Sequence, residues 1–322
     1  MNRTLDFYEP IKQELNEVEE SLFKLSDVSV DCVSPLLSHL FQVQGKKMRP
    51  AITILSSKLF PSSREEPLLM AGAVELLHLA TLIHDDTVDD ASTRRGRATI
   101  ASLWGPQVAV LVGDYIFATS ATFVCDTNNI RVIRRFSETI MELSTGELME
   151  QFSLFDWRQT RKQYEDRIYN KTACLFSTSG ESGAVLSKAP ESVVQSMKNY
   201  GKYLGMAFQV IDDILDFEAA ASEMGKPVGN DLVQGILTLP GMLLLERYPD
   251  DNPIVSLFEG KDEEKHLKMA LDMLHNSDVI HNSYSVAEGF ARQATEAISD
   301  MPESAYKRSL MEIAAYSVER QN

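Results

Sequence analysis

Apolar residues recur three and four positions apart along most of the chain, and this spacing most restricts the fold. One such stripe consists of Ala73, Leu76, Leu77, Ala80 and Ile83. The spacing predicts helices over residues 4–25, 50–59, 66–90, 106–125, 128–153, 160–186, 190–218, 262–275, 281–299 and 303–319. No segment rich in β-branched residues alternates as a strand would, and no repeat or long linker is found. We therefore predict an all-α protein, a single large helical bundle that forms one domain over residues 1–322.

The acidic composition restricts the partners of this chain. It contains 31 Lys and Arg against 47 Asp and Glu, which gives a formal net charge of -16. Nucleic acid and anionic membrane surfaces need basic footprints, so we expect neither as a general partner. An anionic small substrate stays compatible with this charge if metal ions and a few local cations screen it.

The cysteine pattern and the N-terminal segment indicate a cytoplasmic protein. Cys32, Cys125 and Cys174 lie far apart without CxxC spacing, which is typical of thiols in a reducing compartment and not of a zinc site. The N-terminal segment is charged and lacks the apolar core of a signal peptide. The most apolar stretch, residues 68–83, is interrupted by Glu75 and is too short to span a bilayer, so we expect no transmembrane segment.

Two aspartate clusters of the form DDxxD are the most informative motifs. They consist of Asp85, Asp86 and Asp89, and of Asp212, Asp213 and Asp216. Residues four apart share a helix face, where two carboxylates about 5.5 Å apart repel by roughly 3 kcal/mol at an effective dielectric constant of about 20. A solvated helix end is the alternative for either cluster alone. However, both clusters follow strongly apolar turns, and chance gives such a motif roughly 0.1 times per chain of this composition.

Paired carboxylates of this kind indicate a hard cation shared with a phosphate. Oxygen ligands without His or Cys suit Mg²⁺, which keeps several waters and usually also contacts substrate phosphates. Two opposed clusters would then hold one diphosphate through bridging ions. The reaction that this arrangement favours is the departure of diphosphate, because metal ions stabilise the charge that develops on the leaving oxygens.

Basic residues suited to a diphosphate accompany the clusters. Arg offers a fork for phosphate oxygens and Lys a point charge. The candidates are Lys46, Lys47, Arg49, Arg94, Arg95, Lys171 and Lys226. When each basic pair is taken alone, a solvated surface feature is the better explanation, and the neighbouring aspartates could relieve the repulsion between Arg94 and Arg95.

Several motifs between about Gly45 and Pro240 closely resemble, in one order, those of the trans-isoprenyl diphosphate synthases. They read GKKMRP, LIHDDTVDDASTRRG, VGDYIFA, NKTA, FQVIDDILDF and GKPVGNDL. The resemblance implies the isoprenoid synthase fold with a central apolar cavity, a homodimer and Mg²⁺ as cofactor. It also implies a reaction: an allylic prenyl diphosphate ionises, the double bond of isopentenyl diphosphate attacks the cation, and diphosphate takes up a proton in a dry pocket.

The resemblance also implies a role for each matching residue. Asp85, Asp86 and Asp89 would form the first metal motif, with Asp85 and Asp89 as direct ligands. Asp212, Asp213 and Asp216 would form the second, with Asp212 as a ligand of a further ion. Lys171 and Lys226 would join these aspartates as catalytic residues. Contacts to the allylic diphosphate would come from Arg94, Lys171, Thr172, Gln209 and Lys226, and contacts to isopentenyl diphosphate from Lys46, Arg49, His78 and Arg95.

Small residues before the first cluster predict a long product. Ala80 and Thr81 stand where short-chain relatives carry aromatic rings, so the tail could pass toward Leu77, Ala73 and Met70. Ten residues of helix offer about 15 Å of depth. We predict hexaprenyl to decaprenyl diphosphate, with geranylgeranyl diphosphate as the alternative. Close helix packing could also explain the small residues, and the floor could instead be a large side chain such as Phe117, Phe123 or Phe152.

The chain departs from the family pattern at three places, and three other functions are alternatives. Gln44 replaces a frequent Gly, Ile236 a frequent Lys that helps to bind diphosphate, and the C-terminus lacks the basic ending of shorter-chain enzymes. A terpene cyclase would carry a different second metal motif, and a non-catalytic subunit of a heteromeric synthase usually loses aspartates. A di-iron bundle would use ExxH pairs, which occur here at Glu75–His78 and Glu263–His266.

Overall fold

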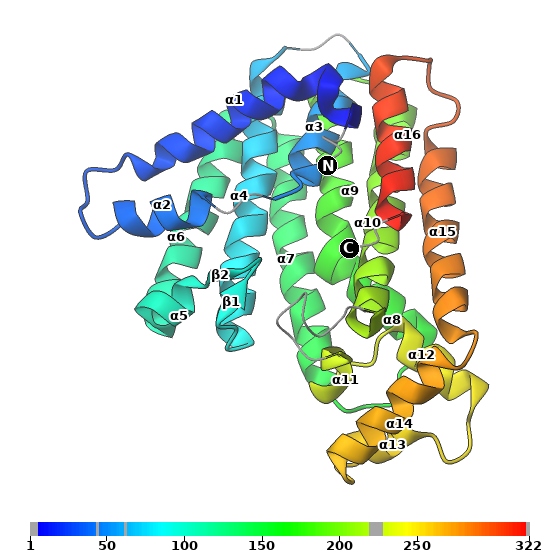
Figure 1. The fold of residues 1–322 in the computed structure, drawn as a ribbon. Helices are drawn as coiled ribbons and strands as arrows, with labels where there is room; N and C mark the ends of the chain where they lie inside the picture. The colour runs from blue at the N-terminus through cyan, green and yellow to red at the C-terminus, as the bar shows by residue number, and fades with distance from the viewer. Residues whose placement is uncertain (1–5, 43–44, 61–62, 219–227, 320–322) are drawn as a thin grey trace. The chain divides into compact units, whose positions relative to one another are not determined.

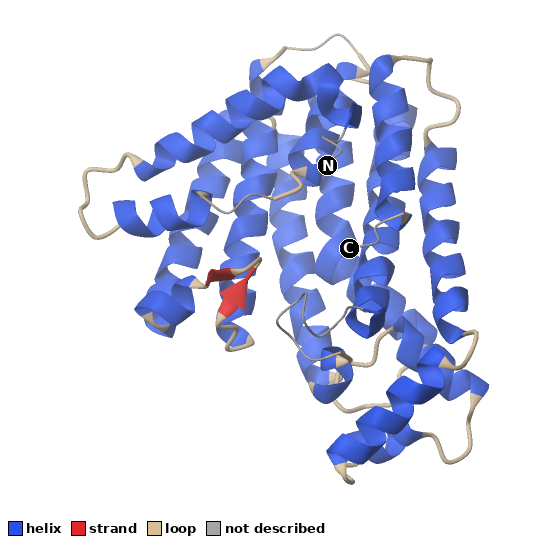
Figure 2. Cartoon of the chain, viewed as in Figure 1, coloured by secondary structure: helices blue, strands red, loops and turns tan. Residues whose placement is uncertain are grey.

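A computed structural model describes residues 6–42, 45–60, 63–218 and 228–319. Helices make up most of this part of the chain (Figures 1 and 2). Its sheet is a single antiparallel pair, β1 (Thr93–Arg94) and β2 (Arg97–Ala98). The predicted all-α fold is therefore confirmed, and the small hairpin is an addition that the sequence pattern did not predict.

The contacts divide the chain into two compact units. Unit 1 contains residues 1–137, 178–198 and 301–310, and unit 2 contains residues 138–177, 199–300 and 311–322. Four helices contribute residues to both units, namely α7 (Ile130–Phe152), α9 (Cys174–Leu186), α10 (Glu191–Glu218) and α16 (Ala305–Val318). The single domain and the central apolar cavity expected from the sequence stay predictions.

Unit 1 is built around one long apolar helix. This helix is α4 (Glu65–Val88). Besides α4 and the hairpin, the unit contains η1 (Asp6–Ile11), α1 (Lys12–Phe23), η2 (Lys24–Ser26), α2 (Ser34–Phe41), α3 (Met48–Lys58), α5 (Ile100–Trp104) and α6 (Pro106–Asp126). Helix α4 packs against α6 and α3. Glycine permits the close approach of α6, since a Cβ at Gly72 would come within 2.9 Å of Phe123 and a Cβ at Gly113 would collide with His84.

Helices α4 and α6 are both long and apolar enough to cross a membrane. The 24 residues of α4 correct the length argument made from residues 68–83, while the expectation that no segment spans a membrane stays a prediction. Its most apolar window is 56% buried inside the protein, whereas that of α6 is only 33% buried. A buried core helix of a soluble protein passes the same test. Burial in the core therefore accounts for the apolar residues of α4 but not for those on the exposed side of α6.

Unit 2 contains the C-terminal half of α10 and a set of shorter helices. These are α8 (Arg161–Ile168), η3 (Tyr169–Ala173), α11 (Asn230–Val233), α12 (Leu239–Arg247), α13 (Pro253–Phe258), α14 (Glu263–His275) and α15 (Val279–Ala297). The predicted helix over 160–186 is divided by η3, which is a π-helical turn. Helix α8 begins with a capping box, in which the side chains of Thr160 and Gln163 each accept a hydrogen bond from the other residue's backbone N–H. Apolar side chains of α8, α10, α12, α13 and α14 form the core.

Candidate active site

Both aspartate clusters lie at the C-terminal ends of long helices. Asp85 and Asp86 are in the last turn of α4, Asp89 follows directly as its C-cap, and the second cluster precedes the end of α10 at Glu218. Carboxylates are unfavourable at this negative end of a helix dipole, and neither last turn contains a basic residue. Clusters of this kind suit a bound cation. The donor set, carboxylate oxygens alone, is the one that Mg²⁺ prefers.

The members of the first cluster have different surroundings. Asp86 is 7% exposed and its Oδ1 accepts a hydrogen bond from Nε of Arg94 at 2.6 Å. Asp85 is half-buried, and Asp89 is exposed. Arg94 therefore holds the one aspartate of this cluster that the sequence did not assign to a metal ion. The two assigned ligands, Asp85 and Asp89, are both more exposed than Asp86.

Four basic or imidazole side chains predicted to bind isopentenyl diphosphate belong to unit 1, and three of them interact. Burial, followed by the charges of Arg49, Arg95 and Arg94, lowers the pKa of His78 well below its usual value. The guanidinium of Arg95 lies against Gly45, where a Cβ would be 2.8 Å from Nη1. Lys46 is exposed, and its carbonyl accepts a hydrogen bond from the hydroxyl of Tyr8 at 2.7 Å. The positive charge thus gathers at the loop that leads into α3.

The start of α3 is itself suited to an anion. Lys47 is its N-cap, Arg49 lies in its first turn, and that turn has no acidic residue. Cations next to the positive end of a helix dipole are unfavourable unless an anion joins them. Lys47 partly meets this need through an ion pair with Glu19. Burial raises the pKa of Glu75, which faces the same cations.

A cavity of about 380 Å³ lies behind this loop, and the sequence analysis did not predict it. Leu15, Val18 and Leu22 of α1 line it together with Leu79 and Glu75 of α4. Its walls are mostly apolar. Ala80 and Leu77, two of the predicted chain-length residues, are fully buried, and Thr81 is half-buried with its hydroxyl bonded to the carbonyl of His78 at 2.8 Å. Phe152 is 89% exposed, so the structure gives no support to a floor at that residue.

The second cluster is tied to residues predicted to bind the allylic diphosphate. Asp213 is 3% exposed, and its Oδ1 accepts from Nε2 of Gln209 at 2.8 Å. Oε1 of Gln209 in turn accepts from Oγ1 of Thr172 at 2.6 Å. Burial raises the pKa of Asp213 to about 7, against the opposing effect of its hydrogen bonds. The structure therefore brings three predicted site residues into one hydrogen-bonded chain.

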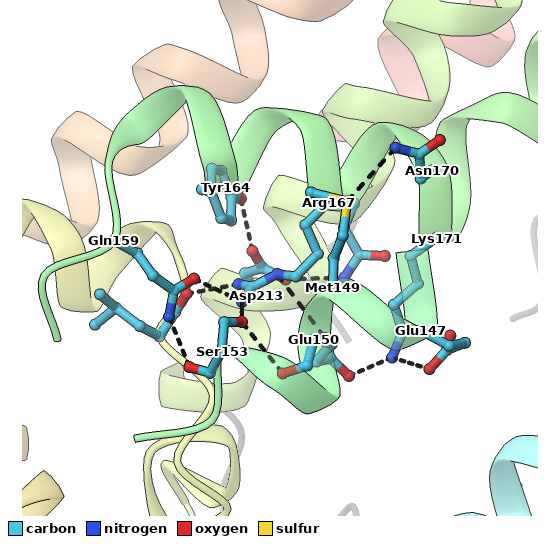
Figure 3. A network of polar contacts seen from close by, with 12 residues as sticks. Glu147, Met149, Glu150, Ser153, Gln159, Tyr164, Arg167, Asn170, Lys171 and Asp213 are labelled. Atoms are coloured by element: carbon cyan, nitrogen blue, oxygen red, sulfur yellow. Dashed lines mark hydrogen bonds and ion pairs between the residues drawn. The ribbon is translucent and has the colours of Figure 1, made fainter. Parts of the chain in front are cut away.

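Lys171 projects from the π-helical turn toward α7 (Figure 3). Its Nζ lies 2.5 Å from Oε1 of Glu150 and 3.2 Å from Oε2 of Glu147. Gly146 makes this possible, because a Cβ there would collide with the backbone of Lys171. A π-turn of this kind is frequent at functional sites, since it redirects side chains within a helix. The ammonium group of Lys171 is thus positioned in unit 2 by two carboxylates that the sequence analysis did not consider.

A further carboxylate, Asp231, joins the second cluster. Its backbone N–H donates to Oδ2 of Asp216 at 3.1 Å. Burial and then the negative charges of Asp216 and Asp213 raise the pKa of Asp231 well above its usual value. Ile236, which replaces a frequent Lys, is half-buried, and its N–H donates to the carbonyl of Asp231. Lys226 and Gln44 lie outside the described residues.

Several functional candidates were missed because their signal is spatial. Glu147, Glu150, Tyr164 and Arg167 carry no motif that distinguishes them in the sequence.

No group of three or more His, Cys, Asp or Glu side chains in residues 6–42, 45–60, 63–218 and 228–319 is arranged to hold a metal ion. Glu263, one member of the second ExxH pair, is exposed on α14.

Comparison with known proteins places these residues in a family context. The polyprenyl synthetase family model matches residues 30–274. The prenyl transferase of Synechocystis is 34% identical over 323 residues, which cover 99% of each chain. Heptaprenyl diphosphate synthase component 2 of Bacillus subtilis is 35% identical, with 88% of this chain and 82% of that protein covered. The crystal structure of a heptaprenyl diphosphate synthase from Staphylococcus aureus has a TM-score of 0.92 at 33% identity, with 97% and 98% covered.

Proposed function

The chain belongs to the polyprenyl synthetase family, and on this premise we propose that it makes a long all-trans polyprenyl diphosphate from isopentenyl diphosphate and an allylic primer. Relatives named solanesyl, heptaprenyl and decaprenyl diphosphate synthase support the long product. Synthases named for geranylgeranyl diphosphate are also similar, at 27% identity. The long-chain enzyme is therefore favoured, and hexaprenyl to decaprenyl diphosphate is the proposed product range.

One observation carries this proposal: a chain of hydrogen bonds links the second aspartate cluster to Gln209 and Thr172. We propose that Asp85, Asp89 and Asp212 bind Mg²⁺, whose positive charge, when bound, stabilises the leaving diphosphate. Arg94, Lys171, Thr172, Gln209 and Lys226 are proposed to bind the allylic diphosphate. Lys171 can bind the diphosphate because Glu147 and Glu150 already position its ammonium group. Binding then requires only that a phosphate oxygen replaces one of these carboxylates as its partner.

The second substrate is proposed to bind at the start of α3. Arg49 and Arg95 would hold the diphosphate of isopentenyl diphosphate together with Lys46, and His78 would contribute a neutral donor. The low pKa of His78 supports this role, because a neutral imidazole offers one N–H without adding to the local positive charge. The first turn of α3 has no acidic side chain that would repel or compete with the same anion.

The chain is also proposed to be a cytoplasmic homodimer. Helix α6 presents Val110, Leu111 and Tyr115 at 44%, 68% and 43% exposure, so a row of apolar residues, with exposed Asp114 beside it, faces outward. A second copy of the chain would cover this row and account for the low burial of the helix. A cytoplasmic location is supported by the cysteine pattern and by the burial of most of the apolar window of α4.

Product analysis tests the proposed function directly. The purified protein is incubated with Mg²⁺, isopentenyl diphosphate and farnesyl diphosphate, and the products are identified by mass spectrometry. A ladder that ends at six to ten isoprene units is the expected result, and a ladder that stops at four would favour the geranylgeranyl alternative. A lack of elongation with every allylic primer would contradict the catalytic assignment. It would favour the subunit alternative, which the name "component 2" of two relatives also raises.

A further inference from the structure

Tyr164 reaches the second aspartate cluster, although no motif assigns it a role. It lies on α8, is 1% exposed, and donates its hydroxyl hydrogen to Oδ2 of Asp213 at 2.6 Å (Figure 3). The other carboxylate oxygen, Oδ1, accepts from Gln209 at 2.8 Å. Both oxygens of Asp213 are thus held by neutral donors from two different helices, and the carboxylate has a fixed orientation.

The hydrogen bonds continue from Asp213 to the proposed substrate contacts. Gln209 uses its Nε2 for Asp213, which leaves its Oε1 to accept from Thr172 at 2.6 Å. The amide can serve both partners only in one orientation, because its nitrogen donates and its oxygen accepts. If the Asp213 carboxylate turns away, no hydrogen bond holds the Gln209 amide in this orientation, and the hydroxyl of Thr172 loses its acceptor. Tyr164 therefore stands at the fixed end of a chain that terminates at the diphosphate contacts.

The ring of Tyr164 is itself held in place by the fold. Arg167, 3% exposed and one turn further along α8, places its guanidinium 5.7 Å from the ring centroid. That guanidinium donates to the carbonyl of Leu237 at 2.6 Å and to Oε1 of Gln159 at 3.1 Å. These bonds do not involve any proposed substrate contact. The direction of the Tyr164 hydroxyl is consequently set by the protein before a substrate arrives.

We propose that Tyr164 is a positioning residue for the allylic diphosphate and acts through Asp213. It holds the Asp213 carboxylate, which in turn orients Gln209 and Thr172 and fixes the last turns of α10 that carry Asp212 and Asp216. Asp213 then serves the cluster as a buried anchor, while its neighbours face the ligand. This inference rests on the proposed function, since the allylic diphosphate is the ligand that Thr172 and Gln209 are proposed to contact.

Tyr164→Phe removes the hydroxyl and keeps the ring. We expect the KM for farnesyl diphosphate to rise between about 10-fold and 100-fold, the range for one lost hydrogen bond to a charged group. The KM for isopentenyl diphosphate is expected to stay within about twofold, because its proposed contacts belong to other elements. Tyr284→Phe is the matched control: it removes a similar bond, from Tyr284 to Oε2 of Glu218 at 2.5 Å in the same unit, and should leave both KM values unchanged.

Dependence on Asp213 is tested by a double-mutant cycle. If Tyr164 acts through Asp213, adding Tyr164→Phe to Asp213→Asn should raise the KM for farnesyl diphosphate by less than about twofold. Independent, multiplicative effects would contradict the inference, and so would a Tyr164→Phe protein whose two KM values rise together. Direct binding of farnesyl diphosphate with Mg²⁺, measured by calorimetry, separates this inference from the proposed function. A parent protein that binds but does not elongate would refute only the function, and equal affinities of parent and Tyr164→Phe would refute only the inference.

Discussion

Lys171 and His78 have opposite electrostatic surroundings. Lys171 lies between two carboxylates, whereas the charged side chains that lower the pKa of His78 are Arg49, Arg95 and Arg94. An imidazole in such a place stays neutral at physiological pH, because burial and the neighbouring cations both disfavour its protonated form. The same residue type would be a pH switch on an open surface. Its surroundings make it a neutral hydrogen-bonding group here.

The lowered pKa of His78 predicts how the stability of the protein changes with pH. Because the pKa of His78 is lowered in the folded state, the unfolded chain binds its proton more readily below the usual value of 6.5. The contribution of His78 is therefore complete above pH 6.5 and is lost as the pH falls below it. Between pH 7.5 and 5.5, the parent should lose about 1 kcal/mol more unfolding free energy than His78→Gln. Urea unfolding at both pH values measures this difference, and parallel losses would contradict it.

Residues that carry a motif could be predicted, and their anchors could not. The sequence analysis named Thr172, Gln209 and Asp213, and these three meet in one hydrogen-bonded chain. Tyr164, 49 positions from Asp213, has no such signal, because a partner so distant in sequence is identified only by the fold. The predicted roles of Asp85, Asp89 and Asp212 as metal ligands stay predictions.

Among the elements, α4 combines a side that is proposed to face the substrate with a side that packs in unit 1. At about 100° per residue, Thr81 lies about 40° from Asp85 around the helix, whereas Leu79 lies about 120° away on the other side. Leu79 lines the cavity of about 380 Å³ in unit 1. Residues two apart on one helix thus face different surroundings, and bulk added at each should have different consequences.

Thr81→Phe should shorten the product, because a ring one turn before Asp85 and on the same face would block the growing tail. The expected ladder ends at about four isoprene units or fewer, a loss of at least two units, while the KM for isopentenyl diphosphate stays within about twofold. Leu79→Phe is the control, since the cavity can accept the added volume without changing product length. Mass spectrometry of the products distinguishes the two variants, and an unchanged ladder from Thr81→Phe would place the floor elsewhere.

The π-helical turn depends on one glycine of α7. A Cβ at Gly146 would collide with the backbone of Lys171, and backbone cannot move aside as a flexible side chain can. Gly146→Ala should therefore push η3 away from α7, destabilise the protein by roughly 1–3 kcal/mol and raise the KM for the allylic diphosphate. Gly289→Ala, at a position of α15 where a Cβ meets only the end of Arg292 at 3.9 Å, is the control and should be neutral or slightly stabilising. Thermal unfolding and steady-state kinetics test both, and equal behaviour of the two variants would refute the prediction.

At the scale of the whole molecule, helical periodicity predicted the long elements well and the short ones poorly. Segments such as 66–90 and 190–218 correspond closely to α4 and α10, because three-and-four spacing over several turns has little alternative interpretation. The β1–β2 hairpin was missed because it is two residues per strand and depends on positive φ angles at Arg95 and Gly96. The two compact units could not be predicted either, since helices α7, α9, α10 and α16 belong to both.

The exposed apolar row of α6 predicts how the molecule assembles. Leu111, at 68% exposure, is the most exposed residue of this row, so Leu111→Glu places a charge where a second copy is proposed to pack. Light scattering after size exclusion should give twice the chain mass of 36.1 kDa for the parent and one chain mass for the variant. Met269→Glu, which charges an apolar side chain of 41% exposure on α14, should remain dimeric. A parent that runs as a monomer would remove the proposed explanation for the low burial of α6, and a dimeric Leu111→Glu would move the interface to another surface.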